Sequence, residues 1–148
     1  MEKGSTYVYF ALRGNNFDPK ILTDRIGIIP TDTWKAGDKG KYKLTLKYSS
    51  WKLSTDVGRE YIMVSNLVEE IVNKLFDKIE IINELKNQYN LYSVLEIVMY
   101  VDTNEEQTTP SLGHDLKTIE FLYRTQTETD IDIYRFNSAI DDTEKNTL

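Results

Sequence analysis

The sequence contains no cysteine, which excludes disulfide scaffolds, cysteine-ligated metal sites and thiol catalysis. It has a single histidine, His114, so no metal site can be built from several histidines, and a Ser-His-Asp triad would depend on this one residue. Because His114 precedes an expected helix, we interpret it as a capping or surface residue.

No apolar run in the sequence is long enough to cross a membrane. The first residues, MEKGSTYVYF, lack the basic segment, apolar stretch and cleavage site of a signal peptide. We therefore expect a cytoplasmic protein. Basic residues are fewer than acidic ones: the chain has 18 Lys and Arg and 24 Asp and Glu, which gives a net charge of -6. This charge disfavours nucleic acid and anionic membranes as partners and favours a basic protein, although many proteins are acidic only for solubility.

The chain of 148 residues is long enough to bury a core, and its 40% hydrophobic and 28% charged residues are typical of a soluble domain. We expect one domain over 1–148. Its ordered core is predicted to span roughly residues 5–137, and the polar segment 138–148 is predicted to fray.

The first third of the chain predicts a strand followed by a short helix. Residues 6–13 alternate between apolar and polar side chains, as a half-buried strand does. A helix is predicted over 19–26, because Asp18 can cap its start, Pro19 suits its first turn and Gly27 suits its end.

Two extended segments are predicted next. IGIIPTDTW is either an edge strand or an extended segment, because Pro30 has no N–H group to donate to a neighbour. After the loop KAGDKGK, residues 42–55 alternate and predict one long strand. That strand would place Leu44, Leu46 and Tyr48 on one side and Thr45, Lys47, Ser49 and Trp51 on the other.

The strongest helical periodicity covers residues 64–76, where Val64, Leu67, Val68, Ile71, Val72, Leu75 and Phe76 recur at helical spacing. Asp77, with Glu80 three residues later, resembles a capping box. We therefore predict a break near residue 77 and a second helix that buries Ile79, Ile82, Leu85 and Tyr89. One continuous helix is the alternative.

The remaining elements are a strand, a helix and a final strand. Residues 91–101 alternate, with Leu95, Ile97, Met99 and Val101 on one face and Tyr92, Val94, Glu96, Val98 and Tyr100 on the other. A helix after Pro110 is marked by Leu112, Leu116, Ile119 and Leu122. The last strand is TDIDIYRF, in which Asp130, Asp132 and Tyr134 share one side.

This order of elements predicts an α+β fold. We expect an antiparallel-dominated mixed sheet of about five strands with helices on one face. Its first part matches the split βαβ, or ferredoxin-like, arrangement, which is here extended by one helix and one strand.

Three stretches resemble a family named the domain of unknown function 4279, found mainly in bacteria. They are FALRGNNFDPKILTDRIGIIPTDTWKAGD, the SSWKLST strand that contains Trp51, and TPSLGHDLKTIEFLYRTQTETDIDIYRF, and the resemblance covers roughly residues 6–136. His114 stands where a small capping residue would be expected. The resemblance implies a small sheet with helices on one side and offers no catalytic residues. Some members resemble components of toxin-immunity gene clusters, which implies antitoxin-type binding.

The predicted strand faces leave one side of the sheet without helices. The apolar residues Val8, Phe10, Leu12, Leu95, Ile97, Met99, Ile131 and Ile133 are expected to face the helices. The candidate binding residues on the other side are Tyr7, Tyr9, Arg13, Trp51, Tyr92, Glu96, Tyr100, Asp130, Asp132 and Tyr134.

Three interpretations of this uncovered side remain open. It is a solvated face on which tyrosines pack across strands, a protein-binding face, or a small-ligand or catalytic site. For the last, Asp130 and Asp132 lie two residues apart on a strand, a spacing that suits a shared cation or an acid-base pair. The spacing marks no third ligand, so we assign no metal and no cofactor. Single-stranded RNA binding is disfavoured by the net charge.

The leading hypothesis is a non-enzymatic cytoplasmic interaction protein of immunity type. Its acidic, tyrosine-rich sheet face would bind a basic partner and occlude a cleft such as that of a nuclease. The alternative is a small-ligand-binding protein or hydrolase that uses Asp130 and Asp132.

Overall fold

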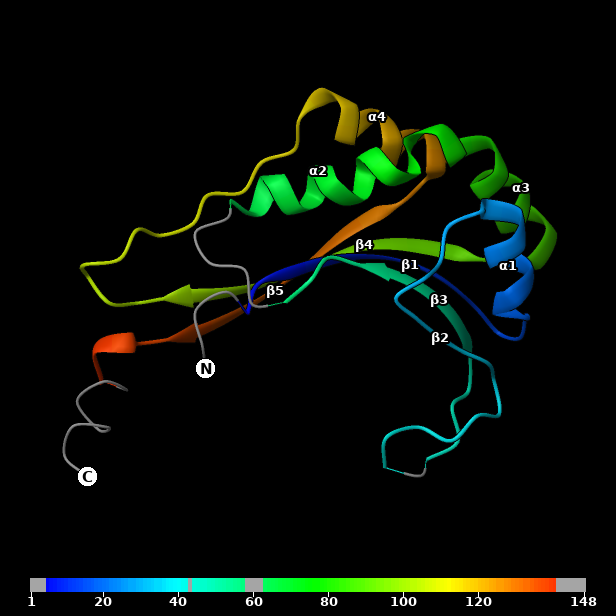
Figure 1. Cartoon of the computed structure of the whole chain (residues 1–148), viewed down its shortest axis with the longest axis horizontal. Coiled ribbons are helices and arrows are strands. Elements are labelled where there is room, and N and C mark those ends of the chain that lie inside the picture. The colour runs from blue at the N-terminus through cyan, green and yellow to red at the C-terminus, as the bar shows by residue number, and fades with distance from the viewer. Residues whose placement is uncertain (1–4, 43, 58–62, 141–148) are drawn as a thin grey trace.

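The computed structural model of the chain describes residues 5–42, 44–57 and 63–140. Within these ranges, one five-stranded sheet carries its α-helices on one side and has no α-helix over the other side (Figure 1). None of the helices in these ranges has the length and apolar content that a membrane span requires. The predicted polar tail lies outside the described residues from position 141 onward.

The sheet has the order β2-β3-β1-β4-β5, so the first strand of the chain lies at its centre. The strands are β1 (Tyr7–Gly14), β2 (Asp32–Trp34), β3 (Ser49–Ser54), β4 (Tyr92–Asp102) and β5 (Glu128–Phe136). All neighbours are antiparallel except β4 and β5, which are parallel. The predicted α+β fold with a mixed, mostly antiparallel sheet is confirmed, whereas the ferredoxin-like name stays a prediction.

The first helix, α1 (Pro19–Ile26), forms as its end signals predict. The Asp18 side chain accepts a hydrogen bond from the Lys20 backbone N–H at 3.0 Å, and Pro19 occupies the first turn. Gly27 ends the helix with φ 77°, a left-handed conformation that glycine adopts without steric cost.

The break near residue 77 is also confirmed. The helix α2 (Val64–Leu75) is followed by a 3-10 turn, η1 (Phe76–Lys78), and by α3 (Ile79–Tyr89). The expected capping box does not form, because the residue preceding α3 is Lys78 and it makes no capping side-chain hydrogen bond. The 3-10 turn instead redirects the chain, so that both helices bury their apolar sides against the same core.

The last helix, α4 (Leu116–Thr125), buries a different side from the one predicted. Asp115 caps it by accepting a hydrogen bond from the Thr118 N–H at 2.8 Å, so His114 is not the cap. Leu116 and Ile119 are exposed, whereas Phe121 is fully buried. Apolar spacing alone did not identify the buried side of α4. Phe121, which contacts Phe10 of β1, is buried, and Leu122 is only partly buried against the core.

The predicted long strand over 42–55 is wrong in its first half. Among the described residues of this range, only Ser49–Ser54 forms a strand, because its neighbour β1 ends at Gly14, opposite Ser49. Before β3 the chain turns back on itself outside the sheet, with a 2.8 Å hydrogen bond from the Gly37 N–H to the Leu46 carbonyl. Leu44 in this segment is therefore exposed.

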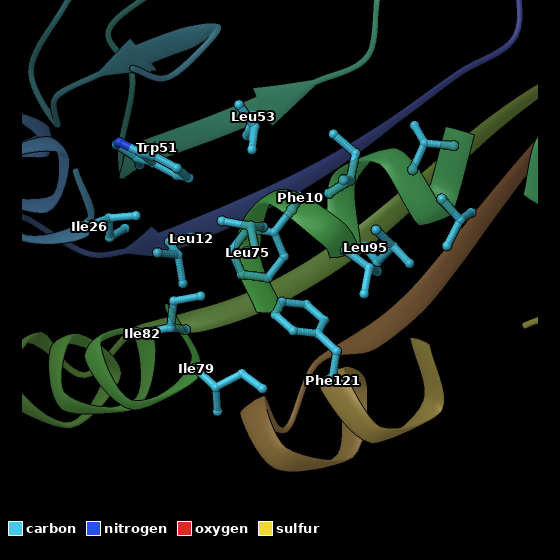
Figure 2. Packing of buried hydrophobic residues seen from close by; sticks show 14 of the residues in the cluster. Phe10, Leu12, Ile26, Trp51, Leu53, Leu75, Ile79, Ile82, Leu95 and Phe121 are labelled. Carbon is cyan, nitrogen blue, oxygen red and sulfur yellow. The ribbon is translucent and has the colours of Figure 1, made fainter. Parts of the chain in front are cut away.

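The core lies between the sheet and the helices (Figure 2). Phe10 of β1 and Phe121 of α4 meet edge to face, with ring centroids 5.8 Å apart. Ile131 and Ile133 do not join this core as expected, since they are 43% and 61% exposed. They belong to β5, the outermost strand, which pairs only with β4.

Candidate functional site

The sheet surface that faces away from the helices is called the open face below. Strand pairing brings the predicted polar residues of β1, β4 and β5 together there, since Tyr9 pairs with Glu96 and Glu96 pairs with Asp130. Further pairs join Arg13 to Tyr92 and Tyr100 to Tyr134, and Tyr7 and Asp132 both flank Val98. The polar residues predicted to share this surface therefore do so, with one exception.

The exception is Trp51, whose placement on this surface is wrong. In the β1–β3 register Trp51 pairs with Leu12, so it lies on the helix side, where it is fully buried. Its indole N–H donates a hydrogen bond to the Thr23 Oγ1 of α1 at 3.0 Å. Strand alternation separates two sets of residues but does not say which set faces the core; the register decides that.

The half of the open face over β1 and β3 carries basic and aromatic side chains. The Arg13 Nη2 lies 3.5 Å from the Tyr9 hydroxyl, and its guanidinium carbon lies 5.8 Å from the centre of the Tyr48 ring. The Lys52 Nζ lies 4.0 Å from the centre of the Tyr9 ring, a favourable cation–π geometry. The sequence interpretation missed Lys52, because it placed the neighbouring Trp51 on this face and strand alternation then puts Lys52 on the opposite side.

Tyrosine pairs line the middle and the outer edge of the open face. The rings of Tyr7 and Tyr9 stack with centroids 6.2 Å apart, and those of Tyr100 and Tyr134 stack at 5.1 Å. Such pairs contribute about 0.5–1.5 kcal/mol each beyond the area that they bury. Tyr134 nevertheless remains exposed, so the surface offers aromatic contact area to a partner.

The half over β4 and β5 contains three carboxylates, Glu96, Asp130 and Asp132, called the acidic cluster below. Parallel pairing places Glu96 beside Asp130, and Asp132 lies on the same side of β5. One carboxylate oxygen from each residue lies within 4.8 Å of the other two. The sequence predicted the pair on β5 and had also placed Glu96 on this face, but only the pairing of β4 with β5 makes Glu96 the third member.

Glu96 is only 5% exposed, although it lies on the open face. Its strand neighbours are Tyr9 on one side and Asp130 on the other, and its Oε1 has no hydrogen-bond partner. Burial, followed by the contacts with Asp132 and Asp130, raises the pKa of Glu96 from 4.5 to about 8. Tyr7 of β1 and Lys52 of β3 also interact electrostatically with this carboxyl group.

A family model described as "Domain of unknown function (DUF4279)" matches residues 4–136. The chain belongs to the DUF4279 family. The resemblance predicted from the sequence is therefore confirmed. The DUF4279 match spans every strand of the sheet and the whole acidic cluster, and the family description names no activity. No significant match was found among curated proteins or among solved structures.

Within residues 5–42, 44–57 and 63–140 the acidic cluster of this DUF4279 chain forms no ion pair, although Lys52 interacts electrostatically with Glu96. The ion pairs between described residues, Arg25 with Glu84 and Arg124 with Glu120, involve none of its carboxylates. Both pairs are exposed to solvent and contribute little to stability. The acidic cluster thus presents carboxyl groups that form no ion pair within the described residues, at one edge of the open face.

A surface cavity of about 320 Å³ lies elsewhere in this DUF4279 chain, beside the start of α1. It is lined by Asp18, Pro19, Lys20, Thr33, Trp34, Lys35 and Asp38. Neither Asp130 nor Asp132 contributes to it, so this cavity does not support a ligand site built on those two residues. The chemistry available to the acidic cluster is that of an open surface.

Proposed function

We propose that this DUF4279 chain is a non-enzymatic protein-binding module whose open face docks on a basic surface of a partner protein. The observation that carries the proposal is the acidic cluster, which forms no ion pair in the described part of the chain and lies at the edge of a tyrosine-lined sheet surface that no described helix covers. Carboxylates steer a basic partner toward the surface, and tyrosines supply contact area at low entropic cost.

The uneven distribution of charge over the open face also supports an oriented complex. Arg13 and Lys52 lie toward β1 and β3, whereas Asp130 and Asp132 lie on β5. A partner with a basic cleft would place that cleft over β4 and β5. If the cleft is an active site, the complex blocks it, which is the mechanism of an immunity-type protein.

Affinity capture with matched variants tests this proposal. The wild-type chain, Asp130→Asn/Asp132→Asn and Glu105→Gln/Glu106→Gln are immobilised and exposed to extract from the native host, and the retained proteins are identified by mass spectrometry. The control also removes two acidic charges, but from exposed residues of the loop between β4 and α4. Each captured partner is then purified for titration against all three chains.

We expect one basic partner to bind the wild-type chain and the control equally. We expect its affinity for Asp130→Asn/Asp132→Asn to be at least about tenfold lower, and binding to weaken as salt is added. Equal binding of each purified partner to all three chains, or the absence of a partner that discriminates them, contradicts the proposal.

The alternative of a small-ligand-binding protein or hydrolase rests on Asp130 and Asp132. It predicts that the wild-type chain turns over an organic ligand, or binds it saturably, without any partner protein. The exposed positions of both aspartates and the location of the 320 Å³ cavity beside Trp34 favour the protein-binding proposal over it.

A further inference from the structure

We infer that Glu96, Asp130 and Asp132 form a binding site for a hard divalent metal cation, with Ca²⁺ as the best fit in size and chemistry. The inference does not depend on the proposed function, because it concerns the isolated chain. It rests on the separation of the three carboxylates and on the burial of Glu96.

The separation of the carboxylates suits one shared ion. An oxygen from each of the three residues lies within 4.8 Å of the other two. Ca²⁺ holds oxygens at about 2.3–2.6 Å, so two of its ligands can lie up to about 5 Å apart. Mg²⁺ holds ligands at about 2.0–2.1 Å and demands a nearly ideal octahedron, which makes it the poorer match.

Glu96 provides the second, independent observation. Its side chain is 5% exposed, and its Oε1 is buried without a hydrogen-bond partner. Buried polar atoms almost always have a partner, since an orphaned acceptor costs about 1–3 kcal/mol. A cation between Glu96 and the two aspartates would supply the missing interaction for a carboxylate that already lies beside them.

The surroundings of the acidic cluster allow an ion to enter the site. Asp130 and Asp132 are exposed, so an ion can reach the site and keep water molecules as its remaining ligands. The nearest basic groups contact Tyr9, the strand neighbour of Glu96: Arg13 lies beside the Tyr9 hydroxyl and Lys52 lies over the Tyr9 ring, from where it also interacts electrostatically with Glu96. With three protein ligands, we expect a dissociation constant on the order of 10⁻⁴ M.

The test uses the purified full chain at mildly alkaline pH, so that protons do not compete with the ion for the carboxylate ligands. Ca²⁺ binding is measured by titration calorimetry for wild type, Glu96→Gln, Asp130→Asn/Asp132→Asn and the Glu105→Gln/Glu106→Gln control. Mn²⁺, a paramagnetic ion that accepts the same oxygen ligands, is then added in trace amounts to the ¹⁵N-labelled wild-type chain. Circular dichroism establishes that each variant is folded.

We expect one saturable Ca²⁺ site in wild type and in the control. We expect binding at least about tenfold weaker in both cluster variants, because each loses charged ligands. Mn²⁺ should broaden amide signals around Glu96 and Asp130 before those of the 104–107 loop. Absence of saturable binding, equal binding by all four chains, or Mn²⁺ broadening centred elsewhere overturns the inference; if a variant does not fold, the Mn²⁺ map of wild type decides.

Discussion

Glu96 and Met99, on opposite sides of β4, are buried to the same degree by different means. Met99 and Glu96 are each 5% exposed, yet Met99 faces the helices and Glu96 faces away from them. Met99 belongs to the apolar core, whereas Glu96 lies between Tyr9 and Asp130 on a surface without a helix over it. The same low exposure therefore identifies Met99 as a core residue and Glu96 as a carboxyl group with a raised pKa.

The energetic consequences of the two kinds of burial are opposite. Burying apolar area on the helix side stabilises the fold by about 25 cal/mol per Å². Burying the Glu96 carboxyl group disfavours its charged form, which is why its pKa rises to about 8. Burial on the helix side thus stabilises the fold, whereas burial of the ionised Glu96 carboxylate costs free energy. The neighbouring Asp130 and Asp132 remain exposed to solvent.

The largest expected effect lies on the helix side. Phe121→Ala removes a fully buried ring that packs against Phe10, and we expect a loss of about 3–5 kcal/mol in the free energy of unfolding. Urea denaturation followed by circular dichroism measures it. A loss below about 1 kcal/mol would contradict the placement of the core between the sheet and the helices.

A pH-dependent effect of intermediate size is expected at Glu96. Its folded-state pKa of about 8 lies above the ordinary value of 4.5, so the folded chain binds the proton more tightly than the unfolded chain does. The stability from this group is fully present below pH 4.5 and is lost as the pH rises toward about 8. At about 1.4 kcal/mol per pKa unit, the loss amounts to at most a few kcal/mol.

Glu96→Gln should remove this component, because glutamine resembles the protonated acid and does not titrate. We expect the variant to gain stability relative to wild type as the pH rises from 4.5 to about 8, as measured by urea denaturation at several pH values in the absence of divalent ions. Parallel stability curves for the two chains would show that Glu96 has an ordinary pKa.

The smallest effect is expected at the outer edge of the open face. Tyr134→Ala removes an exposed ring stacked on Tyr100, and we expect a loss of only about 0.5–1 kcal/mol in unfolding free energy. Tyr123→Ala on α4, where the ring is 76% exposed, serves as the control with a change near zero. A cost for Tyr134→Ala equal to that of Phe121→Ala would mean that the open face is a second core.

Local signals in the sequence predicted the elements whose stability is local. Asp18, Pro19 and Gly27 delimit α1 as expected, and the apolar stripe of α2 is buried as expected. Sequence patterns were less informative for elements that depend on contacts with another strand or helix. Within the described residues, the alternation over 42–55 formed a strand only where β1 offered backbone partners, and the buried side of α4 was decided by the contact between Phe121 and Phe10.

The sequence by itself determined that Asp130 and Asp132 share one side of a strand, because side chains in a strand alternate with a period of two. It also determined that Glu96 lies opposite the apolar residues of its own strand. Only the tertiary structure decided that these carboxylates meet, and that Trp51 lies on the other side of the sheet. The physical reason is that strand order and register arise from packing between segments far apart in the chain, and no local spacing encodes them.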